Sequence, residues 1–191
     1  MDRVRKMRIK ELFQGIAMGL MDGLITLLGI IVGVGVATND AKVVIISGLV
    51  GGISNSFGTS IGFYTSENAE RGQQIEFYKK SKGTRKDLQY IHSHSEIIGS
   101  AILSFIAGAF AIVFPLLPFF LLYDVLTSMI SSLIISAMML FVLGYYIGKI
   151  NETDRLRSGF KYLFLGIMSS IVAFILGEIL RRFIEGKGGI F

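Results

Sequence analysis

The chain has 191 residues, of which 52% are hydrophobic and only 17% are charged, and it carries a net charge of +5. An ordinary soluble domain is about 25% charged, so this composition argues against a soluble protein and excludes a disordered one. The absence of cysteine excludes disulfides, thiolate metal ligands and a thiol nucleophile. The surplus basic residues flank apolar segments, which favours contact with a lipid bilayer over contact with nucleic acid.

Five apolar segments are long enough to cross a bilayer, which takes about 20 residues. Backbone polar groups find no water in the hydrocarbon core, so each segment should be a helix. The sequence therefore predicts an all-α integral membrane protein, with one transmembrane domain over residues 1–191. The predicted spans cover residues 14–37, 43–64, 97–114, 125–148 and 162–180, with Pro115 and Pro118 in the loop after the third span.

Basic residues alternate between the segments outside these spans. Five precede the first span, six follow the second and four follow the fourth, whereas the other two loops hold one and none. Because cytoplasmic loops are enriched in Lys and Arg, the N-terminus should be cytoplasmic. We expect the membrane concerned to be the cell membrane of a prokaryote. Residues 1–13 predict either a surface helix or a basic flank that only fixes topology. Residues 65–94 predict a cytoplasmic helical hairpin that turns near Gly83.

Asp22 is the one charged residue inside the first predicted span. A carboxylate at this depth costs about 3 kcal/mol unless it is paired, hydrated or metal-bound, so it is a candidate functional group. Steps of three or four residues place it on one helical face with small or polar residues and one thioether. These are Gly15, Met18, Thr26, Gly29 and Gly33. The face predicts the wall of an aqueous cation path, and close helix packing is the alternative.

The second span carries a similar face without a charge, formed by Gly48, Gly52, Asn55, Ser56, Thr59 and Gly62. We expect Asp22 to bind a divalent cation, with Met18 as a softer ligand. Oxygen atoms of Asn55, Ser56 or Thr59 would complete the shell. Hydrogen-bonded helix packing needs the same residue types and remains open.

Two further sets of polar residues lie in the later spans. In the fourth span, the serines and the Gly144-x-x-x-Gly148 pattern predict helix packing. In the fifth span, Glu178 is followed by Arg181 and Arg182, which predicts an ion pair within one helix, with an exit-site ligand as the alternative. The serines are Ser128, Ser131, Ser132 and Ser136.

The cytoplasmic insert offers further candidate metal ligands. Glu67 and Glu70 are three residues apart, so on a helix they could hold a hard divalent cation together. His92 and Glu96 are four apart, and imidazole with carboxylate suits Fe(II), Mn(II) or Zn(II). The alternative for the second pair is a solvated helix start capped by a nearby serine.

Two stretches resemble the vacuolar iron transporter family. One is Asp22-Gly23-Leu24 with the glycine-rich run 28–35, and the other is Gly62-Phe63-Tyr64 with Ser66-Glu67. The five-span layout with a cytoplasmic insert is also similar to that family. The resemblance implies a homodimer that moves Fe(II), and often Mn(II), out of the cytosol in exchange for protons. It implies that Asp22 lies in the translocation path and that Glu67 and Glu70 begin a metal-collecting insert.

The sequence contains no P-loop, Gly-x-Ser-x-Gly, His-Glu-x-x-His or dinucleotide motif, so we expect no enzyme, and the metal should be cargo rather than a tightly bound cofactor. We expect the homodimer to pack through small faces of the first two spans. The glycines concerned are Gly29, Gly33, Gly48 and Gly52. The family often carries a glutamate and a methionine in the second span, near Gly51 and Thr59 here. This departure favours the alternative of a non-transporting membrane scaffold or metal sensor.

Overall fold

The computed structural model describes residues 2–80 and 93–186, and for residues 2–11 it describes the backbone alone. The described chain forms five helices without strands, and all five are long and apolar enough to cross a membrane. The predicted all-α, five-span architecture is therefore confirmed, and the chain is a multi-pass membrane protein. The helices are α1 (Asp2–Thr38), α2 (Ala41–Lys80), α3 (His94–Leu121), α4 (Val125–Ile150) and α5 (Arg155–Gly186).

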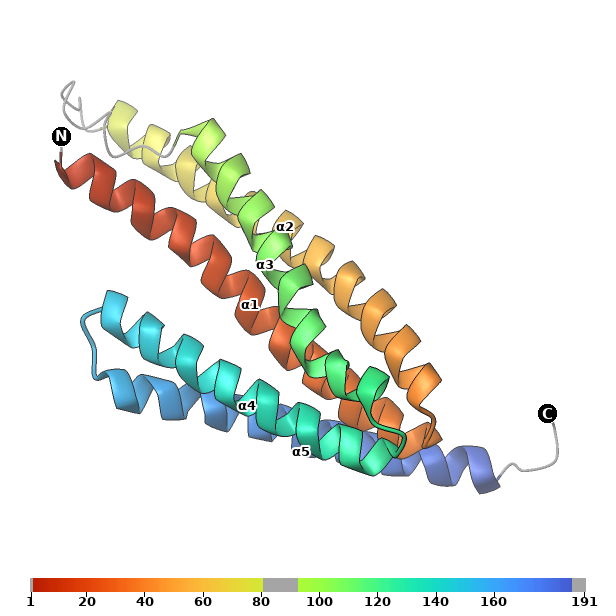
Figure 1. Ribbon diagram of the computed structural model, residues 1–191. Coiled ribbons are helices and arrows are strands. Elements are labelled where there is room, and N and C mark those ends of the chain that lie inside the picture. Colours follow the sequence, from red (N-terminus) through yellow and green to blue (C-terminus); the bar gives the residue numbers. More distant parts are fainter. Residues whose placement is uncertain (1, 81–92, 187–191) are drawn as a thin grey trace.

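Helix α1 is the centre of the bundle, since it packs against each of the other four helices. Helices α2 and α3 also pack against each other, as do α4 and α5. At the end of the bundle that holds the N-terminus, the α4–α5 pair lies apart from α3 (Figure 1). The largest buried cluster joins α1, α2 and α3 through residues such as Leu27, Val44 and Ile112.

A row of glycines sets the close approach of α1 to α3. A Cβ atom added at Gly19 would lie 2.0 Å from the carbonyl oxygen of Ser104, and one at Gly15 would lie 2.5 Å from that of Ser100. Neither site can accept a side chain unless the helices separate. The expectation that Gly15 belongs to the polar face of α1 is therefore wrong, because α3 covers this residue.

The glycines expected at a dimer interface also make contacts inside the chain. A Cβ atom at Gly48 would lie 2.9 Å from Leu116, and one at Gly52 would lie 2.7 Å from Ile112. These two glycines pack α2 against α3, so their placement at a surface between copies is wrong. Gly33 packs against Ala173 of α5, and only Gly29 keeps space beside it, with Ser169 Oγ 3.9 Å from an added Cβ atom.

The two prolines lie inside α3 rather than in a loop, so the predicted end of the third span at residue 114 is wrong. Proline removes a backbone donor, yet a helix can continue where neighbouring groups compensate. The hydroxyls of α4 contact the prolines' own carbonyls rather than those that the missing donors leave free: Ser128 Oγ donates to the Pro118 oxygen at 3.3 Å, and Ser132 Oγ donates to the Pro115 oxygen. The predicted packing role is thereby confirmed for Ser128 and Ser132, whereas Ser131 Oγ donates to the Thr127 oxygen of its own helix at 2.8 Å.

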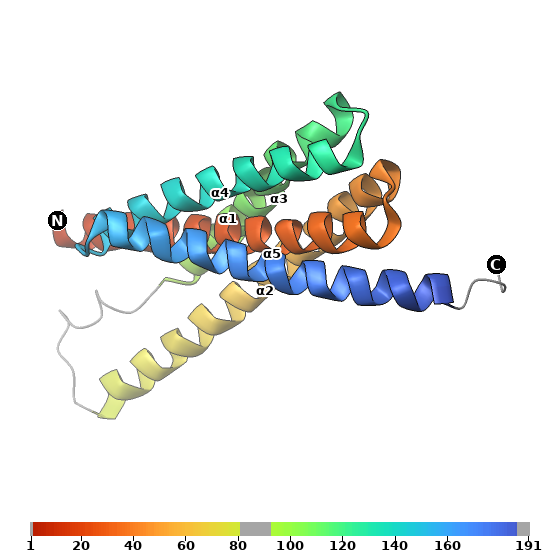
Figure 2. The same cartoon turned by 90° about the horizontal axis from the view of Figure 1, so that it is seen from below.

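Of the two predicted cytoplasmic segments, the N-terminal one differs from one expectation, and the described part of the second agrees with its prediction. Residues 2–13 continue directly into α1, so they do not form a separate surface helix. Helix α2 extends unbroken to Lys80, as expected, and its end projects away from the other helices (Figure 2). The predicted turn near Gly83 lies outside the described residues.

Candidate metal site in the membrane

Asp22 lies where the middle of α1 faces α2, and two side chains of α2 donate to its carboxylate. Asn55 Nδ2 donates to Asp22 Oδ2 at 2.6 Å, and Thr59 Oγ1 donates to the same oxygen. Asn55 and Thr59 are four residues apart, so one helical face of α2 presents both donors. The structure therefore brings together three of the residues that the sequence analysis assigned to the site.

Both donors reach Oδ2, whereas Oδ1 of Asp22 receives no hydrogen bond from the residues that the structure describes. No described cationic side chain pairs with this carboxylate either. Two neutral donors orient the group without neutralising it. An intramembrane carboxylate held in this way has one oxygen available to a proton or to a metal ion.

The remaining predicted ligands within the spans do not converge on this carboxylate. Ser56 is 1% exposed, and its hydroxyl donates to the Gly52 oxygen at 2.9 Å while it packs against Gly108 of α3. Met18 lies one turn before Asp22 and is 45% exposed. Ser56 thus takes part in helix packing, as the alternative interpretation had it, and Met18 lines a separate hollow.

Two hollows follow α1 on either side of Asp22. The first has a volume of about 440 Å³ and lies between α1 and the ends of α4 and α5, where Met18, Asn151 and Tyr162 line it. The second has a volume of about 500 Å³ and lies between α1 and α5, from Thr26 to Thr38. Asp22 therefore occupies the stretch of α1 that separates two hollows.

Several residues that line the first hollow were not among the predicted site residues. Gln14 and Met21 come from α1, and Asn151 and Tyr162 come from the region where α4 and α5 meet. Gln14 is four residues before Met18, and this helical spacing could have indicated that both share a face. No pattern in the sequence indicates that Asn151 and Tyr162 approach α1, because that contact depends on the angle between helices.

The carboxylates of the predicted cytoplasmic insert lie elsewhere. Glu67 is two helical turns beyond Thr59, about 12 Å along α2. Glu70 accepts a hydrogen bond from Gln74 Nε2 at 3.2 Å. Glu96 accepts a hydrogen bond from the Ser93 backbone nitrogen at 3.0 Å, which caps α3. His92 lies outside the described residues.

Among the described residues, no group of three or more His, Cys, Asp or Glu side chains could hold a metal ion. Within the described ranges, Asp22 is therefore a single carboxylate rather than part of a closed cage. At the far end of α5, Glu178 pairs with Arg181 and Arg182 at 2.8 Å each, which confirms the predicted ion pair. Those two arginines are thus engaged with Glu178 and not with Asp22.

Five apolar helices and a hydrogen-bonded carboxylate within the bundle define a multi-pass membrane protein with a polar site between its helices. The chain belongs to the VIT family, whose family model matches residues 13–90 and 75–178. The family resemblance seen in the sequence is therefore confirmed.

Three relatives illustrate this family membership. An uncharacterized protein of Methanocaldococcus jannaschii is 31% identical over 84% of this chain and 86% of its own length. VIT-like transporter 1b of Glycine max is 26% identical over 85% of this chain and 73% of its own length. Vacuolar iron transporter 1 of Arabidopsis thaliana is 30% identical over 42% of this chain and 31% of its own length.

Proposed function

We propose that the protein carries divalent metal ions, Fe(II) or Mn(II), across the membrane, and that it exports them from the cytosol in exchange for protons. The observation that carries this proposal is Asp22, whose carboxylate is oriented by two neutral donors between two hollows along α1. Membership of the VIT family and the names of its iron-transporting relatives support the same function.

The chemistry of Asp22 fits an exchange of metal for protons. A carboxylate binds either a proton or a metal ion, so one group can couple the two fluxes. Its Oδ1 is the free ligand atom, while Asn55 and Thr59 hold Oδ2. The hollow lined by Met18 would admit the ion from the N-terminal side, and the hollow between α1 and α5 would release it on the other side.

Proteoliposomes test this function directly. Purified protein is reconstituted into vesicles that enclose a metal-sensitive dye. Fe(II), Mn(II) and Mg(II) are then added outside the vesicles, with and without an imposed pH gradient. We expect Fe(II) or Mn(II) flux that accelerates when protons can move in the opposite direction. Flux equal to that of protein-free vesicles would contradict transport.

A non-transporting metal sensor on the same fold is the second candidate. It is favoured by the single carboxylate at the site and by Gly51 and Thr59, which stand where the family often has ligands. Measurements on one protein preparation distinguish the two functions. A sensor would bind metal in detergent but give no metal flux after reconstitution into vesicles.

We further propose that the working unit is a homodimer in which the exposed face formed by α1 and α2 packs against the same face of a second copy. A second copy would add a second Asp22 carboxylate, where the described residues of one copy form no group of three acidic or histidine ligands. On α2, Gly58 and Gly62 are exposed, with no atom within 4 Å of an added Cβ. These glycines, rather than Gly48 and Gly52, leave room for another helix.

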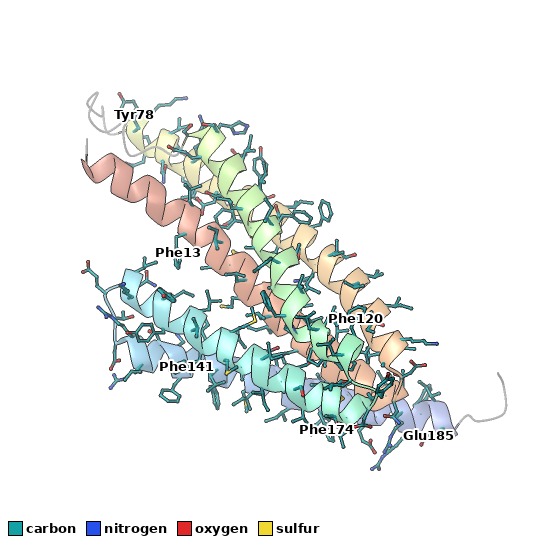
Figure 3. The ribbon with its side chains drawn as sticks, viewed as in Figure 1. Phe13, Tyr78, Phe120, Phe141, Phe174 and Glu185 are labelled. Carbon is teal, nitrogen blue, oxygen red and sulfur yellow. The ribbon has the colours of Figure 1, made fainter. Side chains whose placement is uncertain are left out.

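Cross-linking through single cysteines tests the dimer, because the natural chain has none and every disulfide must join two copies. We expect Gly58→Cys and Gly62→Cys to give cross-linked dimers in membranes after mild oxidation. Phe174, labelled in Figure 3, is an exposed residue of α5. Phe174→Cys is the control and should stay monomeric on a denaturing gel. Equal cross-linking at all three sites, or none at the glycines, would place the interface elsewhere.

A further inference from the structure

A third hollow lies between α1, α3 and α4, and it shares only Phe13 with the hollow that Met18 lines. It has a volume of about 570 Å³, and apolar side chains line it almost completely. Phe13 and Leu24 form its α1 wall, Phe110 lies on α3, and Met138 and Val142 lie on α4. We call this hollow the α1–α3–α4 groove. Its apolar walls suit a hydrocarbon chain.

The groove spans about 12 Å of α4, and the distance from its inner end to the next cation on α4 matches one leaflet of a bilayer. On α4 it runs from Met138 to Tyr146, and Lys149 follows three residues later. The step from Met138 to Lys149 is eleven residues, or about 16 Å of helix. The hydrocarbon of one leaflet is about 15 Å thick, half of the whole core. A lipid chain that fills the groove would thus place its headgroup at the level of Lys149.

A positive charge stands at the headgroup end of the groove. Met138, Val142 and Lys149 follow helical steps of four and seven residues, so Lys149 lies on the face of α4 that forms the groove. Its side chain is exposed and makes no ion pair with any residue that the structure describes. Asp154, five residues after Lys149, accepts hydrogen bonds from the backbone nitrogens of Leu156 and Arg157 in the first turn of α5, at 3.1 and 3.2 Å.

We propose that the α1–α3–α4 groove binds one anionic phospholipid, with an acyl chain along Phe13, Phe110 and Val142 and its phosphate beside Lys149. Apolar walls alone would accept the chain of any lipid. The cation adds the preference for a negatively charged headgroup, since cations at a membrane surface attract anionic lipids. The site is independent of Asp22 and of the proposed transport.

The absence of tryptophan from the chain makes a clean optical test possible. Phe110→Trp places a single reporter in the groove, and Phe174→Trp places the matched reporter on the outer face of α5. The two phenylalanines are 55% and 52% exposed. Each variant is reconstituted in phosphatidylcholine vesicles that contain a rising fraction of phosphatidylglycerol with brominated chains, which quench nearby tryptophan.

We expect Phe110→Trp to be half quenched at a brominated phosphatidylglycerol fraction about five-fold lower than Phe174→Trp requires, the factor typical of one cation near a membrane surface. Adding Lys149→Gln to Phe110→Trp should remove this difference. Lys161→Gln, which removes a charge from α5 outside the groove, should leave it intact. Brominated phosphatidylcholine at the same fractions should quench both reporters alike.

Three results would overturn the proposal. Identical quenching curves for the two reporters would mean ordinary contact with bulk lipid. An unchanged curve after Lys149→Gln would remove the headgroup contact. A Phe110→Trp variant that no brominated lipid quenches would mean that protein, such as a second copy, covers the groove. Met138→Trp on the opposite wall repeats the measurement if Phe110→Trp fails to fold, and helical circular dichroism checks each variant.

Discussion

Asp22→Asn is expected to reduce metal flux in proteoliposomes to the level of protein-free vesicles. The substitution keeps the size of the side chain, and an amide oxygen can still accept from Asn55 and Thr59 as the carboxylate does. It removes the negative charge that would attract a divalent cation and the group that would exchange a metal for a proton. Fold and assembly should survive, because a neutral group is less costly than a charged one in the bilayer.

Asp40→Asn is the matched control for this experiment. Asp40 lies in the turn between α1 and α2, where its Oδ1 accepts from the backbone nitrogen of Lys42 at 2.8 Å. Asparagine caps helices as well as aspartate does, so this variant should transport at the natural rate. Undiminished flux in Asp22→Asn would remove this residue from the mechanism and leave helix packing as the better account of its face.

Gly19→Ala is expected to lower the free energy of unfolding by about 3 kcal/mol, the upper range for overpacking a tight contact. The added methyl group would lie 2.0 Å from the backbone oxygen of Ser104, and a backbone atom cannot move aside as the end of a flexible side chain can. Helices α1 and α3 must then separate. The temperature at which half of the helical circular dichroism signal is lost in detergent measures the effect.

Gly99→Ala provides the comparison, since Gly99 lies in the same helix as Ser104 and no atom is within 4 Å of an added Cβ. Alanine is favoured over glycine in a helix by about 1 kcal/mol, so this variant should be at least as stable as the natural chain. If both variants melt alike, the close contact of α1 with α3 is not a determinant of stability.

The sequence by itself determined the number of spanning helices among the described residues and indicated the residue around which the candidate site is built. Long apolar segments can only be helices in a bilayer, and Asp22 is conspicuous because it is the one charge in its span. The sequence also predicted the ion pair of Glu178 with the arginines that follow it, because an interaction within one helix depends only on spacing.

Only the tertiary structure decided which side of each helix meets which neighbour. Asn55 and Ser56 are adjacent in the sequence and chemically similar, yet one donates to Asp22 while the other packs against α3. Gly48 and Gly58 would serve equally well at a helix contact, but one is buried inside the chain and the other is open. Helical spacing shows which residues share a face, whereas the angles and distances between helices determine what that face touches.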